Sequence, residues 1–317
     1  MPSPVAILPP DSPGHALEMA GEKVAVAAQP VAAGRALRDF VELTKPRVVT
    51  MILVTTLVGF YLASPAAVDF PLLLHTLAST ALAAAGTLAL NQYLERDLDG
   101  MMLRTRMRPI PAGRLEPREA LVFGALVTAI GIAYQTLAVG ALAATVTAAT
   151  TASYLFLYTP MKRWTPLCSF VGAVPGALPP VTGWAAAADS LGIAAWVLFA
   201  ILFLWQLPHS LAIARLYRDD YARAGIRLLP VIDPDGESTG RQIVTNSLAL
   251  LSVALLPTLV GLTGAWYFFS ALVLGLGLLG FSIQLARTRA LADARRLLFA
   301  SLVYLPVLLA VMALDKL

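Results

Sequence analysis

Apolar runs of membrane-spanning length follow one another from residue 48 almost to the end of the chain. A helix needs about 20 mainly apolar residues to cross the roughly 30 Å hydrocarbon core of a bilayer. Only 13% of the residues are charged, about half the share in soluble domains. We therefore predict an all-α polytopic membrane protein with nine transmembrane helices, at about 48–65, 70–92, 119–138, 140–159, 167–185, 192–214, 243–262, 265–286 and 297–314.

The basic residues lie on one side of this predicted arrangement. With the N-terminus placed in the cytoplasm, all but one of the 23 Lys and Arg residues fall in cytoplasmic segments, and the exception is Lys316. An excess of Lys and Arg in the cytoplasmic loops is what sets the orientation of membrane proteins. We expect a multi-pass protein of the cytoplasmic (inner) membrane, with its N-terminus inside and its C-terminus on the outer side. The net charge of +4 then reflects the orientation in the membrane. It does not indicate a nucleic-acid partner.

The short predicted loops leave no room for a second soluble domain. We interpret residues 1–36, rich in Pro, Ala and Gly, as a flexible cytoplasmic tail and residues 37–317 as one intramembrane domain. The single cysteine, Cys168, excludes an intramolecular disulfide and a cysteine metal cluster. The three histidines lack the HExxH spacing of zinc hydrolases.

Two predicted cytoplasmic loops carry more charge than orientation requires. In the first, Asn91, Glu95 and Asp99 are spaced four residues apart, so a continuing helix places their oxygens on one face. Oxygen ligands suit Mg²⁺, which typically takes one or two carboxylates plus substrate phosphates. Arg104 and Arg108 follow, and guanidinium groups match phosphate oxygens. This stretch favours a magnesium–diphosphate site over arginines that only orient the loop.

The second charged loop carries the adjacent acids Asp219 and Asp220, again where a predicted span ends. Two acidic helix ends on one side of the membrane could share a diphosphate through Mg²⁺. We therefore expect Asp220 to join the first three residues as a metal ligand, directly or through the diphosphate. Lys162 and Arg163, in the short cytoplasmic loop between the predicted spans 140–159 and 167–185, either bind the diphosphate or only anchor that loop inside.

Several stretches resemble the UbiA-like intramembrane prenyltransferase superfamily. The first loop is similar to its NDxxD-type motif, with Glu95 where Asp is usual. A closer resemblance, to the branch that modifies heme, spans about residues 40–315. It rests on TKPR at 44–47, YTPMKR at 158–163, the Gly- and Pro-rich segment 171–184, WQLPH at 205–209 and DDYARAG at 219–225.

This resemblance implies a nine-helix bundle around a central cavity that opens to the cytoplasmic side. It implies transfer of a farnesyl group from farnesyl diphosphate to the vinyl group of heme b, with water adding a hydroxyl to give heme O in the heme A pathway. Mg²⁺ is the implied cofactor, heme b is the implied substrate, and a heme A synthase is the implied downstream partner. The motif residues Asn91, Glu95, Asp99, Asp219 and Asp220 would be catalytic, with the diphosphate held by Arg104, Arg108, Lys162 and Arg163.

Aromatic faces can stabilise a passing farnesyl cation, and the candidates are Tyr154, Tyr158, Trp205, Tyr217 and Tyr221. His209 follows Pro208 inside a predicted span and shares a face with Trp205. Ionisable groups inside membranes are expensive and often functional. Three interpretations of His209 stay open: a heme-facing group or axial ligand, a diphosphate contact, or a histidine bonded to a carbonyl that Pro208 frees.

Two other functions compete with this one. A prenyltransferase for another aromatic acceptor, such as 4-hydroxybenzoate or a chlorin, would share the diphosphate site. A transporter of an anionic lipid or diphosphate would place its polar groups in broken helices near the bilayer midplane, often in two related halves. The predicted acids cluster on the cytoplasmic face instead, which favours an enzyme. A structural assembly factor would not need them.

Overall fold

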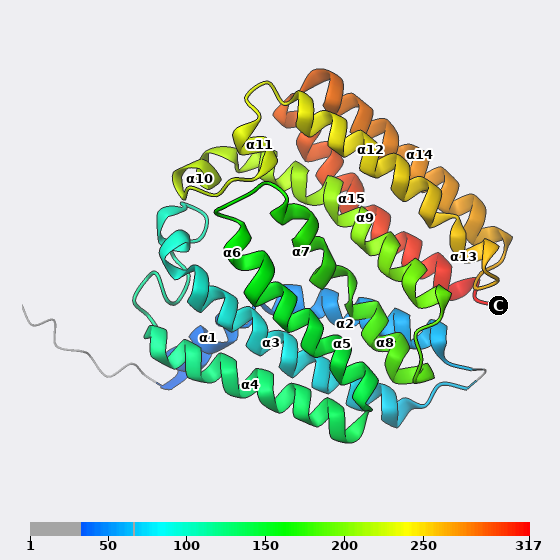
Figure 1. Ribbon diagram of the computed structural model, residues 1–317, viewed down its shortest axis with the longest axis horizontal. Coiled ribbons are helices and arrows are strands. Elements are labelled where there is room, and N and C mark those ends of the chain that lie inside the picture. The colour runs from blue at the N-terminus through cyan, green and yellow to red at the C-terminus, as the bar shows by residue number, and fades with distance from the viewer. Residues whose placement is uncertain (1–32, 66) are drawn as a thin grey trace, which may run out of the picture.

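The computed structural model describes residues 33–65 and 67–317 as a bundle of long helices (Figure 1). Most of the predicted tail lies outside the described residues, and its last four residues, 33–36, lie in the first helix. Apart from one isolated bridge between Thr263 and Lys316, the described ranges are helices and connecting loops. The elements are α1 (Ala33–Leu43), α2 (Pro46–Ala63), α3 (Phe70–Met101), α4 (Pro117–Ala138), α5 (Ala141–Ala152), η1 (Ser153–Tyr158), α6 (Thr159–Met161), α7 (Cys168–Ala177), α8 (Pro179–Ala188), α9 (Ile193–Leu216), α10 (Arg218–Arg223), α11 (Leu229–Ile232), α12 (Glu237–Ala254), α13 (Leu256–Leu259), α14 (Ala265–Thr288) and α15 (Leu291–Leu314).

Among the described residues, eight helical segments are long and apolar enough to cross a membrane, so the chain is a multi-pass membrane protein. They match eight of the nine predicted spans. The remaining span, predicted at 167–185, is two ten-residue helices, α7 and α8, that meet at Leu178. Pro179 and Pro180 have no backbone N–H to continue the helical ladder, so the helix breaks there. Neither half meets the length for a crossing, and nine separate spanning helices are not confirmed.

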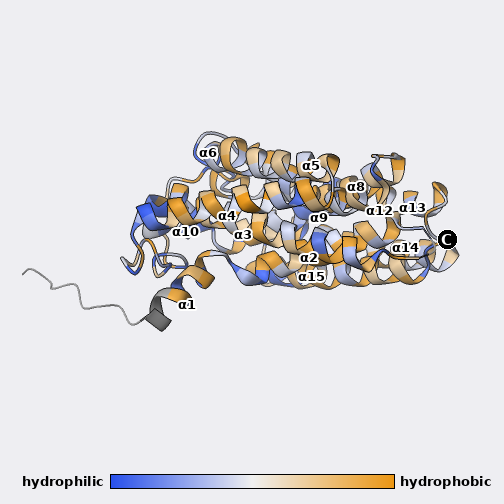
Figure 2. Ribbon diagram, turned by 90° about the horizontal axis from the view of Figure 1, so that it is seen from below, coloured by the Kyte–Doolittle hydropathy of each residue, from blue (hydrophilic) through white to orange (hydrophobic). Residues whose placement is uncertain are grey.

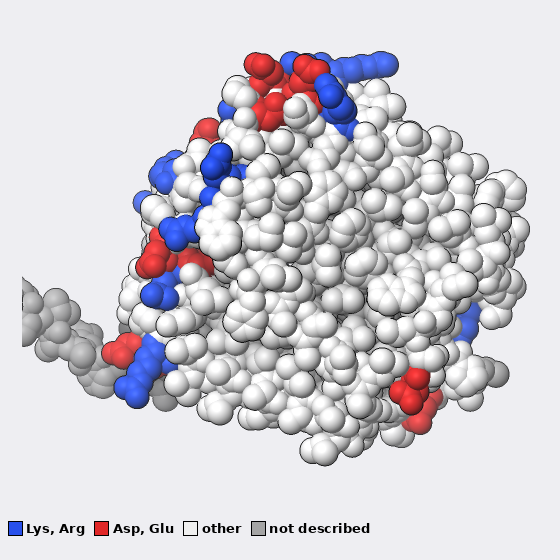
Figure 3. Space-filling model, in the orientation of Figure 1, with Lys and Arg blue, Asp and Glu red and all other residues white. Residues whose placement is uncertain are grey.

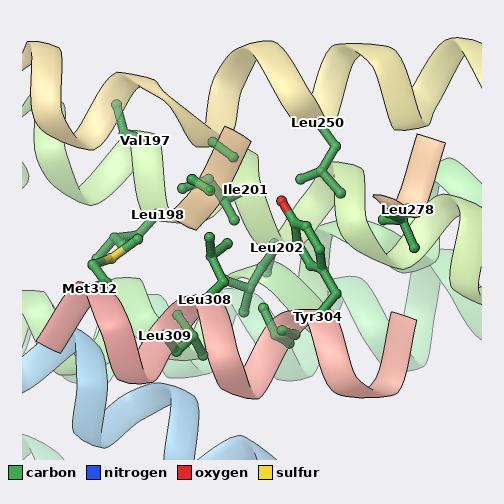
Figure 4. Packing of buried hydrophobic residues seen from close by; sticks show 14 of the residues in the cluster. Val197, Leu198, Ile201, Leu202, Leu250, Leu278, Tyr304, Leu308, Leu309 and Met312 are labelled. Atoms are coloured by element: carbon green, nitrogen blue, oxygen red, sulfur yellow. The ribbon is translucent and has the colours of Figure 1, made fainter. Parts of the chain in front are cut away.

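Hydrophobic residues, orange in Figure 2, recur along all of the long helices, as expected for helices packed in a bilayer. The largest buried cluster joins α9, α12, α14 and α15. Figure 4 shows Leu198 and Ile201 of α9 facing Tyr304 and Leu308 of α15, with Leu250 of α12 above them. All five side chains are at most 2% exposed.

The charged residues gather at one end of the bundle, along the edge formed by the α3–α4 loop, α10 and the N-terminal end of α12 (Figure 3). The C-terminus lies at the other end (Figure 1). There Lys316, the exception to the charge pattern, donates to the carbonyl oxygens of Tyr61 at 2.8 Å and Ser64 at 2.6 Å. Lys316 therefore ties the end of α15 to the end of α2.

Helices α2 and α8 approach closely because a glycine on each helix faces the backbone of the other helix. A Cβ on Gly183 of α8 would lie 2.0 Å from the carbonyl oxygen of Thr56 in α2, and a Cβ on Gly59 would lie 2.0 Å from that of Pro180. Real Cβ atoms do not approach backbone this closely. The seam between the broken helix and α2 therefore depends on small residues, as is common between membrane helices.

We predict that Gly183→Ala destabilises the protein by about 1–3 kcal/mol, because the added methyl forces α2 and α8 apart. Thermal unfolding of the detergent-solubilised protein measures this loss. The matched control is Gly277→Ala in α14, where a Cβ meets nothing within 4 Å. Equal melting temperatures for the two variants would contradict the close packing of α2 on α8.

Candidate active site

Asn91, Glu95 and Asp99 lie on one buried face of α3, which continues past the predicted end of its span to Met101. Each of the three accepts a hydrogen bond from a cationic side chain. Lys45 Nζ lies 3.0 Å from Asn91 Oδ1, Lys162 Nζ lies 2.5 Å from Glu95 Oε1, and Arg108 Nη1 lies 2.6 Å from Asp99 Oδ2. The α3 face therefore meets three cations drawn from three different segments of the chain.

The cations outnumber the acids on this face. Glu95 and Asp99 are salt-bridged to Lys162 and Arg108, whereas Lys45 has no carboxylate within 4 Å among the described residues and bonds to a neutral amide. Burial lowers the pKa of Lys45 to about 7, and the charges of Arg108 and Lys162 act in the same direction. Burial also disfavours the charge of Lys162, but Glu95 outweighs it and raises the pKa of Lys162 well above its ordinary value.

Lys45 was not among the predicted site residues, although it belongs to the TKPR stretch. Its backbone is left-handed, with φ of 51° and ψ of 66°, a conformation that costs a non-glycine residue about 1–3 kcal/mol and is found at functional sites. The preceding helix α1 fixes this geometry. Gln92 donates to the carbonyl of Leu43 at 2.7 Å, and Arg114 is salt-bridged to Asp39 and Glu42.

A π-helical turn, η1, brings two tyrosines to the site. Thr159 donates through its backbone N–H and its hydroxyl to the carbonyl of Tyr154, and such wide turns often mark functional sites. The Tyr154 hydroxyl lies 3.4 Å from Asn91 Oδ1. Lys162 Nζ lies 4.4 Å from the Tyr158 ring centroid. Gly172 makes room for that ring, because a Cβ there would meet it at 2.5 Å.

Beyond these tyrosines lies a cavity of about 520 Å³ with largely apolar walls. Four predicted aromatic or histidine positions line it, namely Tyr154, Tyr158, Trp205 and His209. Arg47 lines the cavity too. Trp205 stacks on the His209 ring with centroids 4.7 Å apart.

His209 is not bonded to a carbonyl freed by Pro208, so that interpretation is wrong. Its Nδ1 lies 2.8 Å from the hydroxyl of Ser301 in α15, and the indole of Trp205 donates to the Ser301 carbonyl. The Ser301 hydroxyl itself donates to Leu298 O at 2.7 Å. It must therefore accept from Nδ1–H, which leaves Nε2 as the unprotonated nitrogen.

The second charged loop is joined to the first through Asp220. Its carboxylate accepts from the backbone N–H of Leu103 at 3.3 Å and of Arg104 at 3.2 Å, and from the side chain of Arg223 at 2.7 Å. Partial burial would raise the pKa of Asp220, but these hydrogen bonds outweigh it and lower the pKa below its ordinary value. Asp220 thus holds the chain that follows the α3 motif.

Other predicted site residues lie away from the α3 face. Asp219 is exposed. Arg104 and Tyr217 are exposed partners, with the guanidinium 5.2 Å from the ring centroid, and Tyr221 contacts the same arginine. Arg163 is exposed and lines a separate cavity of about 400 Å³ beside Glu95. In the described part of the chain no group of three or more His, Cys, Asp or Glu side chains is poised to hold a metal.

The geometry combines a cation-rich acidic face with an adjoining apolar cavity in a bundle of membrane helices. The family model described as "UbiA prenyltransferase family" matches residues 52–303. The chain therefore belongs to the UbiA prenyltransferase family. Membership favours prenyl transfer over the transporter and the assembly factor.

Curated relatives show which members of the family this chain is similar to. The chain is 49% identical over 289 residues to a protein of Solibacter usitatus named protoheme IX farnesyltransferase, covering 88% of this chain and 99% of that one. It is 44% identical over 291 residues to a protein of the same name from Koribacter versatilis, covering 88% and 94%.

Solved structures share the fold at low sequence identity. A digeranylgeranylglyceryl phosphate synthase superposes with a TM-score of 0.75 at 16% identity, over 88% of this chain and 98% of that chain. A UbiA homologue from Archaeoglobus fulgidus, bound to GPP and Mg²⁺, superposes with a TM-score of 0.60 at 16% identity, over 86% and 99%.

We predict that Asp220→Ala loosens the loop after α3, because the N–H groups of Leu103 and Arg104 lose their acceptor. Amide hydrogen exchange of that loop should rise about tenfold in this variant. Asp219→Ala, the neighbouring exposed acid, is the matched control and should exchange like the parent protein. Unchanged exchange in Asp220→Ala would contradict the anchoring role.

Proposed function

We propose that this chain transfers the farnesyl group of farnesyl diphosphate to a vinyl group of heme b, with water adding a hydroxyl to form heme O. The observation that carries the proposal is the α3 face, where three cations surround two carboxylates beside an apolar cavity. The positive charges of the cations complement a diphosphate, and the apolar walls of the cavity suit an isoprenoid chain and a porphyrin. The identity to curated farnesyltransferases supports the choice of both substrates.

We propose that Lys45, Lys162 and Arg108 bind the diphosphate. Each now contacts an oxygen of the α3 face, and a bound phosphate group would offer them stronger acceptors. Arg104 and Arg163 are exposed and would contribute at the rim. These groups stabilise the negative charge that grows on the diphosphate as the allylic C–O bond breaks.

The donor set of the α3 face fits Mg²⁺. Asn91, Glu95 and Asp99 offer only oxygen atoms, and cations that shift onto the diphosphate would release both carboxylates as ligands. Bound there, Mg²⁺ would neutralise charge on the departing diphosphate. Asp220 is engaged by two backbone N–H groups and Arg223, so we assign it to loop anchoring and not to the metal.

We propose that the cavity holds both the farnesyl chain and the acceptor ring. Tyr154, Tyr158 and Trp205 line it, and aromatic rings can stabilise an allylic cation. Its mostly apolar walls keep bulk water from the cation before the carbon–carbon bond forms. His209 lines the same space. The rings of Tyr217 and Tyr221 contact the guanidinium of Arg104. We therefore assign both tyrosines to supporting the loop that follows α3.

We also propose the inner membrane as the location, with the charged end of the bundle in the cytoplasm. The positive-inside rule supports this orientation. Helix α1 contacts the α3–α4 loop at the charged end through Arg114, and the C-terminus lies at the other end. The cavity would then receive its diphosphate from the cytoplasmic side. A heme A synthase that takes up the product is the partner this reaction implies.

Membranes that contain this chain should convert heme b, farnesyl diphosphate and Mg²⁺ into a heavier heme that carries a hydroxyethylfarnesyl group. We predict that Asp99→Asn lowers the rate at least about a hundredfold, because it removes a charge on which the site's electrostatics depend. Asp97→Asn is the control, since Asp97 is 79% exposed on the same helix, and it should keep most of the activity. Mass spectrometry of extracted hemes measures both.

The same assay separates the competing acceptors. No modified heme, together with prenylation of 4-hydroxybenzoate or a chlorin, would reject the heme assignment and leave the diphosphate site intact. Full activity in Asp99→Asn would reject the site.

The pKa of Lys45 near 7 makes diphosphate binding depend on pH. A bound diphosphate favours the charged form of Lys45 and raises its pKa in the complex. Binding should therefore be tightest below about pH 7 and weaken above it by up to about tenfold per unit, with uptake of one proton. Calorimetric titration with a prenyl diphosphate and Mg²⁺ in buffers of different ionisation enthalpy measures both effects.

Lys45→Arg is the matched variant, because arginine stays charged throughout this range. It should lose the proton uptake and the steeper decline, while titration of the ligand itself affects both proteins equally. The same pH dependence in the two proteins would show that another group takes up the proton.

A further inference from the structure

Gln206 presents an unused acceptor to the cavity. Its amide nitrogen donates to two carbonyl oxygens, those of Leu202 at 3.1 Å and Ala173 at 3.4 Å. Two carbonyl acceptors fix the amide with its nitrogen on that side. The oxygen, Oε1, therefore points the other way, and it has no hydrogen-bond partner among the described residues. Gln206 Oε1 is also not fully buried, because part of its surface stays accessible.

The neighbouring helix is shaped around this oxygen. A Cβ on Gly176 of α7 would lie 2.0 Å from Gln206 Oε1, so only glycine leaves room for the amide. Gly176 and Gln206 both line the 520 Å³ cavity. A free acceptor that faces a largely apolar cavity is costly unless something donates to it.

His209 lies one helical turn after Gln206, on the same side of α9, and lines the same cavity. Its Nδ1–H is committed to the Ser301 hydroxyl, and stacking on Trp205 holds the ring. The nitrogen left to face a ligand, Nε2, carries a lone pair. Gln206 Oε1 and His209 Nε2 are thus two acceptors and no donor, a combination that suits a group with two O–H bonds.

We propose that Gln206 and His209 hold and deprotonate the water molecule that hydrates the modified vinyl group. The inference rests on the proposed function. In that reaction the farnesyl C–O bond breaks and C1 of the farnesyl group bonds to the terminal vinyl carbon, which leaves a cation on the carbon attached to the porphyrin. The water oxygen bonds to this carbon, and its proton passes to His209 Nε2. Farnesyl diphosphate, heme b and water give heme O, diphosphate and one proton.

Gln206 and His209 are therefore catalytic residues that contact the attacking water, and Ser301 is a positioning residue. Ser301 accepts from Nδ1–H because its own hydrogen is given to Leu298 O. It thereby holds His209 in the tautomer that can receive a proton at Nε2. Without a held water, the cation can lose a proton from the adjacent carbon and form an alkene. That product is lighter than heme O by one water.

The test is the ratio of these two products in membranes supplied with heme b, farnesyl diphosphate, Mg²⁺ and ¹⁸O-labelled water. The parent chain should form labelled heme O. Gln206→Met, which removes the acceptor at similar size, should shift the ratio about tenfold toward the lighter product while diphosphate release continues. His209→Phe should shift it further, and Ser301→Ala should shift it less.

The outcomes separate this inference from the proposed function. If the parent chain releases no diphosphate with heme b, the proposed function fails. If the parent makes heme O but Gln206→Met and His209→Phe do so with no lighter product, the inference is overturned and the function stands. An unlabelled hydroxyl would overturn it as well. So would a changed Soret band of bound heme in His209→Phe, since His209 would then be an iron ligand.

Discussion

Pairing of charges at one end of an apolar bundle is the interaction on which the rest of this structure depends. An isolated charge buried in a low-dielectric interior costs several kcal/mol, so buried carboxylates persist only with partners. Glu95 and Asp99 meet this condition through Lys162 and Arg108. The same pairs pre-position the cations that an anionic substrate needs, because a diphosphate can replace the carboxylates as their partner. Stability without substrate and affinity for it thus use the same side chains.

The cavity depends on a second constraint, the cost of unpaired backbone groups in a membrane. Irregular backbone at that depth is tolerated only where it is buried in protein or lines a cavity. Three irregular segments obey this rule here. The π-turn η1 contributes Tyr154 and Tyr158 to the cavity wall, the break between α7 and α8 contributes Pro179, and the left-handed Lys45 leads into Arg47. These three departures from regular helix lie at or next to the space where chemistry is proposed.

The sequence predicted the spans well because bilayer thickness fixes the length of an apolar run. It also predicted the α3 face, since residues four apart on a helix share a side regardless of what surrounds them. The sequence did not predict side-chain partners that come from distant segments of the chain. Lys45 joins Asn91 across 46 residues, and Ser301 joins His209 across 92. Those contacts depend on how helices cross, which a hydropathy pattern does not specify. Pro179 and Pro180 were visible, yet a proline can kink a membrane helix or break it.

The sequence predicted that both acidic loops share one diphosphate, and the structure gives their acids different contacts. The first presents oxygens along a rigid helix, where spacing alone aligns them. The second ends in a short helix, α10, whose Asp220 binds the backbone of Leu103 and Arg104. That loop continues to Arg108, which contacts Asp99. Asp220 therefore acts on the first motif through the chain that carries Arg108. An adjacent pair of acids suffices for this task, because only one carboxylate has to reach the loop while the other stays in solvent.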